Sequence, residues 1–327
     1  MRVKKGLAYL LVLVMMATLV VGCGTTGEVE DGEKEGKAEK QFITIATGGT
    51  AGTYYPLGGA IMEILNQNIE GMNASAASTG ASVANTNQLN SGEADIAFIQ
   101  NDISYYAVNG TEMFADNQIE GLRAISTIYP ETIQLVTLEK LGINSVADLK
   151  GKRVAVGDKG SGTEANARQI LEAYGITYDD IKVQYLSFAE AANGLKDGNV
   201  DVGFITAGFP TAAIQDISAQ HDVKLISLDE EARDKLIAEY PFYTKVTIPE
   251  DAYPKQEGEV DAIAVKAMLV VTDKMDEDTA YNITKAIYSN LDRLAVAHPV
   301  GKDITNETAT EGMSIPMHPG AERFFNE

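Results

Sequence analysis

The stretch from residue 43 to residue 56, ITIATGGTAGTYYP, decides the fold of this chain. An apolar, β-branched run ends at Gly48 and Gly49, a loop of small residues follows, and a helical pattern begins near Tyr54. The first N–H groups of such a helix have no intrahelical acceptor and carry about half a positive charge. They can therefore hold an anionic group without Lys or Arg. The alternative is a plain strand-to-helix turn that needs glycine only for its φ angle.

The same arrangement occurs a second time in the chain. Residues 153–156 (RVAV) predict a strand, residues 157–163 (GDKGSGT) a loop and residues 164–171 (EANARQIL) a helix. Downstream of each loop, LNSGEADIAF at 89–98 and LKDGNVDVGF at 195–204 share the pattern L-x-x-G-x-x-D-[IV]-[AG]-F. Two equivalent βαβ units predict two similar lobes, each offering a helix N-terminus to a ligand.

The N-terminal segment is expected to be an export signal, covering residues 1–22. A basic start (MRVKK) precedes an apolar run over 7–21 that is shorter than the roughly 20 residues of a membrane span. The run ends in VVGC, which resembles a lipobox, so Cys23 is expected to be lipidated; an idle cysteine in a discarded peptide is the alternative. Residues 23–40 are charged and nearly free of large apolar side chains, which predicts a flexible tether.

The acidic balance restricts the possible partners. The formal net charge is −21, and removal of the basic signal makes it more negative. Such a chain repels phosphates, so nucleic acid is not an expected partner. Any anionic ligand must be held by local donors that act against the field of the whole protein.

The boundary between the lobes is placed near Thr137 and Leu138. Residues 122–130 and 133–138 predict two successive strands, after which the second βαβ repeat begins. Residues 261–272 (DAIAVKAMLVVT) predict a long apolar strand that leads back into the first lobe. Lobe 1 is expected to comprise residues 41–137 and 263–327, and lobe 2 is expected to comprise residues 138–262.

Candidate ligand contacts also follow predicted strands, because ligands of open α/β sheets bind beyond the carboxyl ends of strands. Gln100 and Asn101 follow one such strand, and the loop at 206–210 follows its counterpart in the second repeat. For the amide pair, a turn and helix cap is the alternative role. Arg123 lies at the start of a long strand, far from its carboxyl end, so a structural salt bridge is expected in preference to a ligand contact.

No metal-binding or catalytic constellation is visible in the sequence. The three histidines stand apart from one another: His221, His298 and His318. No zinc-protease, G-x-S-x-G or P-loop motif occurs. The segment 160–165 (GSGTEA) fits a dinucleotide-binding pattern, but the next predicted strand ends at Ser187 where an acid is required. We therefore expect no cofactor, no metal and no enzymatic activity.

Four segments together resemble the TAXI family, the solute receptors of one class of TRAP (tripartite ATP-independent periplasmic) transporters. They are TGGTAGTYYPLGGAI (47–61), GEADIAFIQND (92–102), RAISTIYPE (123–131) and GSGTEANAR (160–168). The resemblance, which runs from about Gln41 to the final helix, implies an α/β, two-lobe, periplasmic-binding-protein-like fold of type II. Each lobe would be a mixed sheet flanked by helices, with the ligand in the cleft between them. The implied ligand is a small anionic organic solute, an amino acid or dicarboxylate such as glutamate, glutamine or 2-oxoglutarate.

The resemblance also implies a set of binding residues and a partner. Carried over residue by residue, the pocket comprises Thr50, Ala51, Gly52, Thr53, Tyr54, Gln100, Asn101, Tyr129, Ser161, Gly162, Thr163 and Gly208. Ala51 departs from the glycine that is commoner at its position. Closure of the lobes around the solute would present the receptor to membrane permease subunits. The implied location is extracytoplasmic, either lipid-anchored at the membrane or periplasmic. An ABC-importer substrate-binding lipoprotein or a ligand sensor of the same fold is the alternative, and an extracellular enzyme is a third possibility.

Overall fold

The structure is a computed structural model that describes residues 40–327. The predicted signal, the lipidation site Cys23 and the tether up to residue 39 lie outside the described residues. The described residues belong to one compact unit. None of their helices combines the length and the apolar character needed to cross a membrane.

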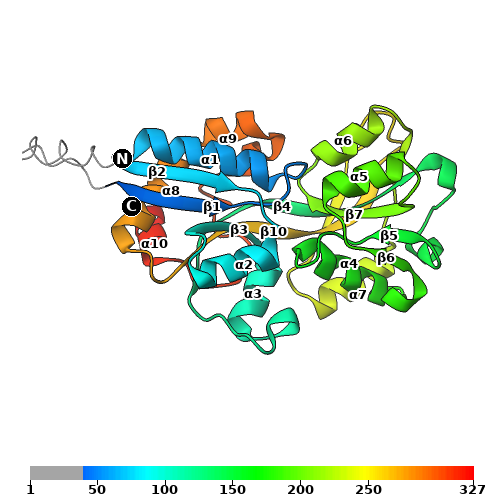
Figure 1. Cartoon of the computed structure of the whole chain (residues 1–327), viewed down its shortest axis with the longest axis horizontal. Coiled ribbons are helices and arrows are strands. Elements are labelled where there is room, and N and C mark those ends of the chain that lie inside the picture. The colour runs from blue at the N-terminus through cyan, green and yellow to red at the C-terminus, as the bar shows by residue number, and fades with distance from the viewer. Residues whose placement is uncertain (1–39) are drawn as a thin grey trace, which may run out of the picture. The chain divides into compact units, whose positions relative to one another are not determined.

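One sheet of ten strands runs through the described chain (Figure 1). Its order is β2-β1-β3-β10-β4-β7-β5-β6, with β8 paired to β4 and β9 paired to β10. The strands are β1 Gln41–Ala46, β2 Met72–Ala77, β3 Ile96–Gln100, β4 Leu122–Leu138, β5 Arg153–Ala155, β6 Lys182–Gln184, β7 Val202–Ala207, β8 Val223–Leu225, β9 Thr244–Ile248 and β10 Val260–Thr272. The parallel pairs β1–β2, β1–β3, β5–β6 and β5–β7 belong to the two predicted βαβ repeats.

The long strands β4 and β10 join the two halves of the molecule (Figure 1). They pair with each other antiparallel, while β3 pairs with β10 in one half and β7 with β4 in the other. The limits proposed for lobe 1 (41–137 plus 263–327) and lobe 2 (138–262) fall at the end of β4 and inside β10. We use these limits below to name the two halves. The two strands are therefore the only regular elements that the lobes share among the described residues.

The two strands predicted at 122–130 and 133–138 are in fact one. Pro130 was expected to end the first strand, but it lies inside β4 and faces Lys266 of β10. The pairing of β10 with β4 shifts register between Lys266 and Met268, next to this proline. A bulge of this kind accommodates a residue that cannot donate to the ladder, so the strand continues.

Helices cover both faces of the sheet in each half (Figure 1). They are α1 Tyr54–Asn68, α2 Ser82–Ser91, α3 Asn101–Asn109, α4 Gly162–Ala173, α5 Phe188–Lys196, α6 Ala212–Ser218, α7 Glu230–Glu239, α8 Glu277–Tyr288, α9 Leu291–Ala297 and α10 Pro319–Phe325. The helical segment at 276–297 is interrupted at Ser289 and Asn290, so that α8 and α9 are separate. Helix α1 buries a stripe of Leu57, Ile61, Ile64 and Leu65.

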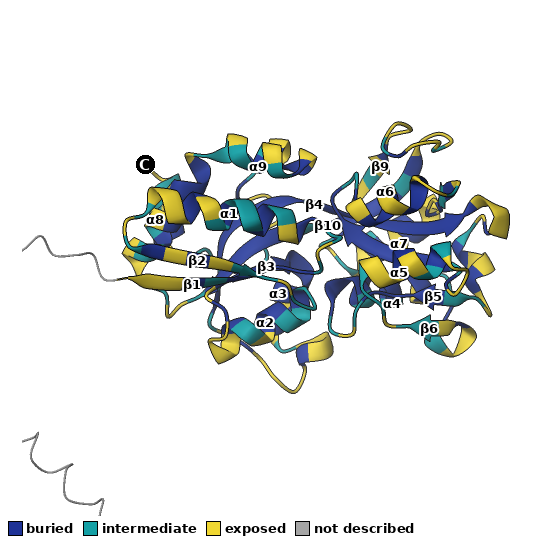
Figure 2. Cartoon of the chain, turned by 45° about the horizontal axis from the view of Figure 1, so that its top comes forward, coloured by how far each residue is buried: buried dark blue, intermediate teal, exposed yellow. Residues whose placement is uncertain are grey.

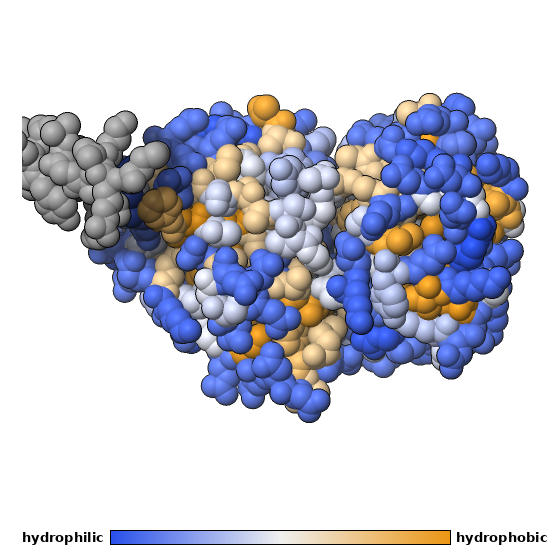
Figure 3. Space-filling view, in the orientation of Figure 1, coloured by the Kyte–Doolittle hydropathy of each residue, from blue (hydrophilic) through white to orange (hydrophobic). Residues whose placement is uncertain are grey.

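The buried apolar side chains form clusters in each half. Figure 2 shows β4 and β10 as mostly buried and without exposed residues, whereas β1, β2 and β6 carry exposed residues. On the face shown in Figure 3, hydrophilic residues dominate and apolar residues reach the surface in separate patches. Burial of both crossing strands fixes the connection between the lobes inside the core.

Helix α1 lies close against the end of β1, and a glycine permits this approach. A Cβ on Gly58 would lie 2.3 Å from Cγ2 of Thr47, whereas a Cβ on the adjacent Gly59 would meet nothing within 4 Å. The close contact brings the start of α1 to the carboxyl end of β1.

We expect substitution of these two neighbouring glycines by alanine to have opposite effects on the stability of the protein. Gly58→Ala should destabilise the protein by about 1–3 kcal/mol, because Thr47 is buried and cannot move away freely. Gly59→Ala should stabilise it by about 0.5–1 kcal/mol, the gain of alanine over glycine in a helix interior. Urea denaturation of both variants measures the difference, and equal effects would contradict the packing described here.

Candidate functional site

A cavity lies between the two lobes at the ends of the predicted loops. It is lined by Gly48, Gly49, Gly52, Thr53, Tyr54, Ala81, Ser82, Gln100, Tyr129, Glu131, Asp158, Ser161, Gly162, Thr163, Phe188, Thr206 and Ala207. Its volume is about 40 Å³, which is room for roughly three water molecules or one small solute. The cavity therefore suits a compact ligand and has no space for a nucleotide or a long alkyl chain.

Two helices begin at this cavity, one from each lobe. The N-terminal residue of α1, Tyr54, and the first two residues of α4, Gly162 and Thr163, all line it. The side chain of Ser161 caps α4 by accepting from the Glu164 N–H at 3.1 Å, as its spacing predicts. Helix α1 has no side-chain cap. First-turn N–H groups of both helices are thus left without intrahelical acceptors beside the cavity.

A glycine is required where α4 approaches lobe 1. A Cβ on Gly162 would lie 1.8 Å from Oε1 of Gln100, which belongs to the end of β3. The helix start and the strand end therefore meet across the cleft with no space for a side chain.

Strands contribute three buried polar side chains to the cavity wall. Gln100 ends β3, while Tyr129 and Glu131 lie two residues apart on β4 and so share one face of the strand. The exposed fractions of these residues are 2%, 1% and 2% respectively. The Tyr54 hydroxyl donates to Glu131. Oε1 of Gln100 and the hydroxyl of Tyr129 have no hydrogen-bond partner in the protein.

Burial controls the ionisation of the acidic groups near the cavity. It raises the pKa of Glu131 from its ordinary value of 4.5 to about 8, although the hydrogen bond from Tyr54 acts in the opposite direction. It also raises the pKa of Asp102, at the start of α3, to about 7. The pKa of Asp158 is raised by partial burial and by Glu190. An ionised Glu131 inside the cavity thus lacks the solvation that normally stabilises a carboxylate.

Hydrogen bonds cross directly between the lobes around the cavity. Asn166 of α4 accepts from Gln100 Nε2 at 3.2 Å and donates to Asp102 at 3.0 Å. The N–H of Gly208 donates to the hydroxyl of Thr53 at 3.2 Å. These contacts exist only when the lobes are close together, so the structure represents a closed cleft.

The structure brings most of the predicted binding residues to the cavity. Those that line it are Gly52, Thr53, Tyr54, Gln100, Tyr129, Ser161, Gly162 and Thr163. Their contact with a ligand stays a prediction. Their common location is the space between the two glycine loops, where the sequence predicts that a ligand binds.

Four predicted residues lie elsewhere. Thr50 and Ala51 line a neighbouring hollow, which shares Gly49, Asp158 and Phe188 with the cavity. Asn101 has the alternative, structural role: its amide donates to the Gly312 carbonyl at 2.9 Å and accepts from the N–H groups of Asp102 and Lys266. Gly208 packs against Tyr129 and Val300, where a Cβ would lie 2.5 Å from Val300.

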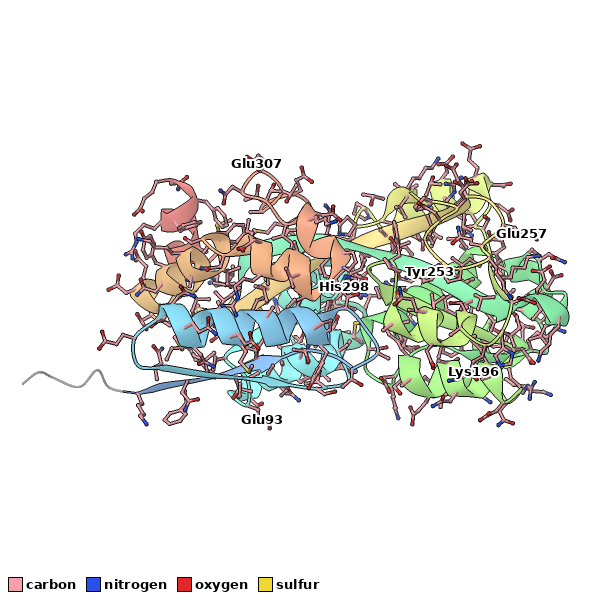
Figure 4. All side chains as sticks on the ribbon, turned by 90° about the horizontal axis from the view of Figure 1, so that it is seen from above. Glu93, Lys196, Tyr253, Glu257, His298 and Glu307 are labelled. Carbon is pink, nitrogen blue, oxygen red and sulfur yellow. The ribbon has the colours of Figure 1, made fainter. Side chains whose placement is uncertain are left out.

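Arg123 and two of the histidines also have structural roles. Arg123 pairs with Asp273 at 3.5 Å, the salt bridge that was expected. His298 and His318 each accept from a backbone N–H two residues downstream and cap short helices. Figure 4 shows His298 near the boundary between the lobes, where burial lowers its pKa. Among the described residues, no group of three or more His, Cys, Asp or Glu side chains could hold a metal ion.

Sequence reasoning missed several cavity residues, above all Glu131. The strand was predicted to end at Pro130, and Glu131, the last residue of the segment 123–131, was given no role in the site. Asp158, Ser82 and Phe188 were also missed, whereas Thr206 belongs to the loop at 206–210 that was predicted to reach the ligand. Asp158 lies within the second glycine loop, so its position was visible in the sequence although its role was not.

Comparisons with known proteins define the class to which this fold belongs. The alkanesulfonate-binding protein SsuA from Xanthomonas axonopodis pv. citri bound to MOPS matches with a TM-score of 0.51 at 17% identity, over 88% of this chain and 84% of that one. PhnD1 from Prochlorococcus marinus (MIT 9301) in complex with methylphosphonate matches with a TM-score of 0.52 at 11% identity, over 80% and 88%. A putative L-cystine ABC transporter protein from Listeria monocytogenes matches with a TM-score of 0.51 at 17% identity, over 82% and 99%. The predicted α/β periplasmic-binding-protein-like fold is confirmed.

The chain belongs to the NMT1-like family, whose model matches residues 45–327. Among curated proteins, a segment of 85 residues is 34% identical to the putative aliphatic sulfonates-binding protein of Escherichia coli (strain K12). That match spans 26% of each of the two chains. The comparisons support membership among binding proteins of this fold and do not single out the TAXI class.

We expect the stability of the protein to depend on pH through Glu131. Its pKa is raised in the folded state, so its contribution is most favourable below about pH 4.5 and is lost as the pH rises to about 8. Burial of Asp102 acts in the same direction up to about pH 7. Glu131→Gln removes the titration, so the variant should lose less stability than the wild type between pH 5 and pH 8. Urea denaturation at both pH values measures this difference.

Glu93→Gln serves as the control, because Glu93 projects into solvent from lobe 1 (Figure 4). If the Glu131 variant and the wild type lose equal stability over this pH range, then ionisation of the buried Glu131 carboxyl group does not destabilise the folded protein.

Proposed function

We propose that this protein is an extracytoplasmic receptor that captures a small solute with an acidic group and delivers it to a membrane permease. The observation that carries the proposal is the pair of helix starts, at Tyr54 and Gly162, beside one cavity between two lobes. The predicted signal and Cys23 support a lipid anchor and an extracytoplasmic location. The role is one of binding, with no catalytic step.

The acidic group would be held by backbone N–H groups. The cavity lining contains no Lys, Arg or His among the described residues, so the first-turn amides of α1 and α4 are its strongest positive ends. Enclosure removes water, and a hydrogen bond from an oriented amide to an anion is stronger in that lower dielectric. The hydroxyls of Ser161, Thr163 and Tyr129 supply further donors.

Capture would depend on lobe closure. Each lobe contributes only half of the donors, and the hydrogen bonds from Gln100 to Asn166 and from Gly208 to Thr53 form between lobes. A solute that contacts both helix starts binds the closed arrangement better than the open one, and so shifts the population toward closure. The crossing strands β4 and β10 are where such a motion would bend.

The names of similar proteins agree with an acidic solute. They refer to alkanesulfonate, methylphosphonate and cystine, each of which carries at least one acidic group. Glutamate, glutamine or 2-oxoglutarate remain the candidates that the TAXI resemblance adds.

We expect Gly162→Ala to weaken solute binding at least tenfold. The added Cβ would overlap Gln100 and hold the lobes apart, so the amides of α4 could not reach a solute bound to lobe 1. Calorimetry with glutamate, glutamine, 2-oxoglutarate, methanesulfonate and methylphosphonate first identifies a solute that binds the wild type. The variant is then measured with that solute.

Gly59→Ala is the control, since a Cβ there meets nothing and the residue lies outside the cavity. Unchanged affinity in a folded Gly162→Ala variant would count against the site. Failure of every solute to bind the wild type, with no solute retained in native mass spectrometry, would count against the receptor function.

The type of permease is a separate question. The names of the similar structures include an ABC transporter, so the comparisons favour the ABC-importer alternative over the TRAP transporter. We therefore expect uptake of the captured solute to require ATP hydrolysis by a partner encoded near the receptor. Uptake that persists when ATP is depleted, together with a neighbouring gene for a permease of about a dozen apolar spans, would instead support the TRAP interpretation.

A further inference from the structure

The cavity combines its helix starts with an excess of hydrogen-bond acceptors. The carboxyl groups of Glu131 and Asp158 line it, and so does Gln100, whose Oε1 is buried without a partner. No Lys, Arg or His belongs to the lining among the described residues. Glu131 accepts from the Tyr54 hydroxyl, but the lining offers no positive charge to pair with either carboxyl group, and Oε1 of Gln100 has no donor.

The orientation of the Gln100 amide follows from its neighbours. Asn166 donates through Nδ2 to Asp102 at 3.0 Å and also to the hydroxyl of Tyr243 at 3.0 Å, which places its Oδ1 toward Gln100. Nε2 of Gln100 donates to that Oδ1 at 3.2 Å. The remaining atom, Oε1, is therefore an acceptor whose partner must be supplied from outside this network.

A solute that carries only acidic groups is poorly complementary to this acceptor-rich cavity lining. Its negative charge at the helix starts would be repelled by Glu131 and Asp158 wherever these groups are ionised. Gln100 would keep an unsatisfied oxygen, and a buried acceptor without a donor is costly. A buried carboxylate such as Glu131 is tolerated when an opposite charge pairs with it.

We propose that Glu131 is the counter-ion of an ammonium group on the solute, and that the receptor therefore selects small acids that also carry a primary amine. Asp158 and Oε1 of Gln100 provide acceptors for the remaining N–H bonds of the ammonium group. The helix starts hold the acid group of the same molecule. This assignment rests on the proposed receptor function and adds to it the residue that separates amino acids and aminosulfonates from their amine-free analogues.

Matched pairs of solutes test the assignment directly. Calorimetry compares amino acids with acids of similar shape that lack the amine: glutamate with glutarate, taurine with ethanesulfonate, and each of the common amino acids with its 2-oxo acid. The amine-bearing members should bind the wild type at least tenfold more tightly. Glu131→Gln should weaken their binding at least tenfold and leave the binding of amine-free acids unchanged or tighter. Glu93→Gln should change neither.

The possible results separate the two proposals. Amine-free acids that bind as tightly as their partners would overturn the role of Glu131 and leave the receptor function intact. Absence of binding by every member of all pairs would overturn both. The comparison of solutes on the wild type needs no variant, so it decides the matter even if Glu131→Gln fails to fold.

The pH dependence of binding gives a second measurement. The titratable groups that face Glu131 are Tyr54 from α1, Tyr129 from β4 and Asp102 from α3, and Asp158 of the second glycine loop lines the same cavity. Pairing with an ammonium group requires an ionised Glu131, so affinity should fall as the pH is lowered from 8 to 6, and binding at pH 7 should release a proton. A protonated Glu131 that donates to an acid group would give the opposite trend, and that result would overturn the assignment.

Discussion

The structure depends on one constraint: a charged group taken out of water must find a partner of opposite charge or oriented dipoles. In this protein the lining of the cavity carries carboxyl groups and helix starts but, among the described residues, no cationic side chain. Backbone amides are therefore the source of positive potential, and they can act only where α1 and α4 begin. Gly52 and Gly162 belong to the cavity for this reason, since side chains at these places would keep a solute away from the amides or the lobes away from each other.

The same constraint explains why the site is divided between two lobes. Under the proposed function, a solute enters while the lobes are apart, and the two halves connected by the buried strands β4 and β10 suit such a motion. The polar residues that meet across the cleft, Gln100, Asp102 and Asn166, satisfy one another when the lobes are together. Their hydrogen bonds favour closure, while the burial of Asp102 and Glu131 opposes it to the extent that these groups are ionised. In the proposed mechanism, the contacts of a bound solute with both lobes add to the terms that favour closure.

Much of the architecture could be predicted from the sequence because it depends on local patterns. The two glycine loops, the repeat around Gly92 and Gly198, and the cap formed by Ser161 all reflect interactions between residues a few positions apart. The helix start at Tyr54 followed from the same patterns, and the second helix, predicted from residue 164, begins two residues earlier at Gly162. Pro130 was misinterpreted because a proline usually ends a strand, and only the register shift in β10 allows β4 to continue past it.

The sequence by itself determined that two βαβ units occur, where their helices begin and that the backbone there can receive an anion. Only the tertiary structure decided which side chains complete the cavity, because their positions depend on contacts between residues far apart in the chain. Glu131 reaches the cavity through the continuation of β4, Thr50 and Ala51 line a neighbouring hollow, and the pairing of Asn101 with Gly312 removes that amide from the site. The ionisation of Glu131 likewise follows from its burial, and burial is a property of the packed molecule that no local pattern encodes.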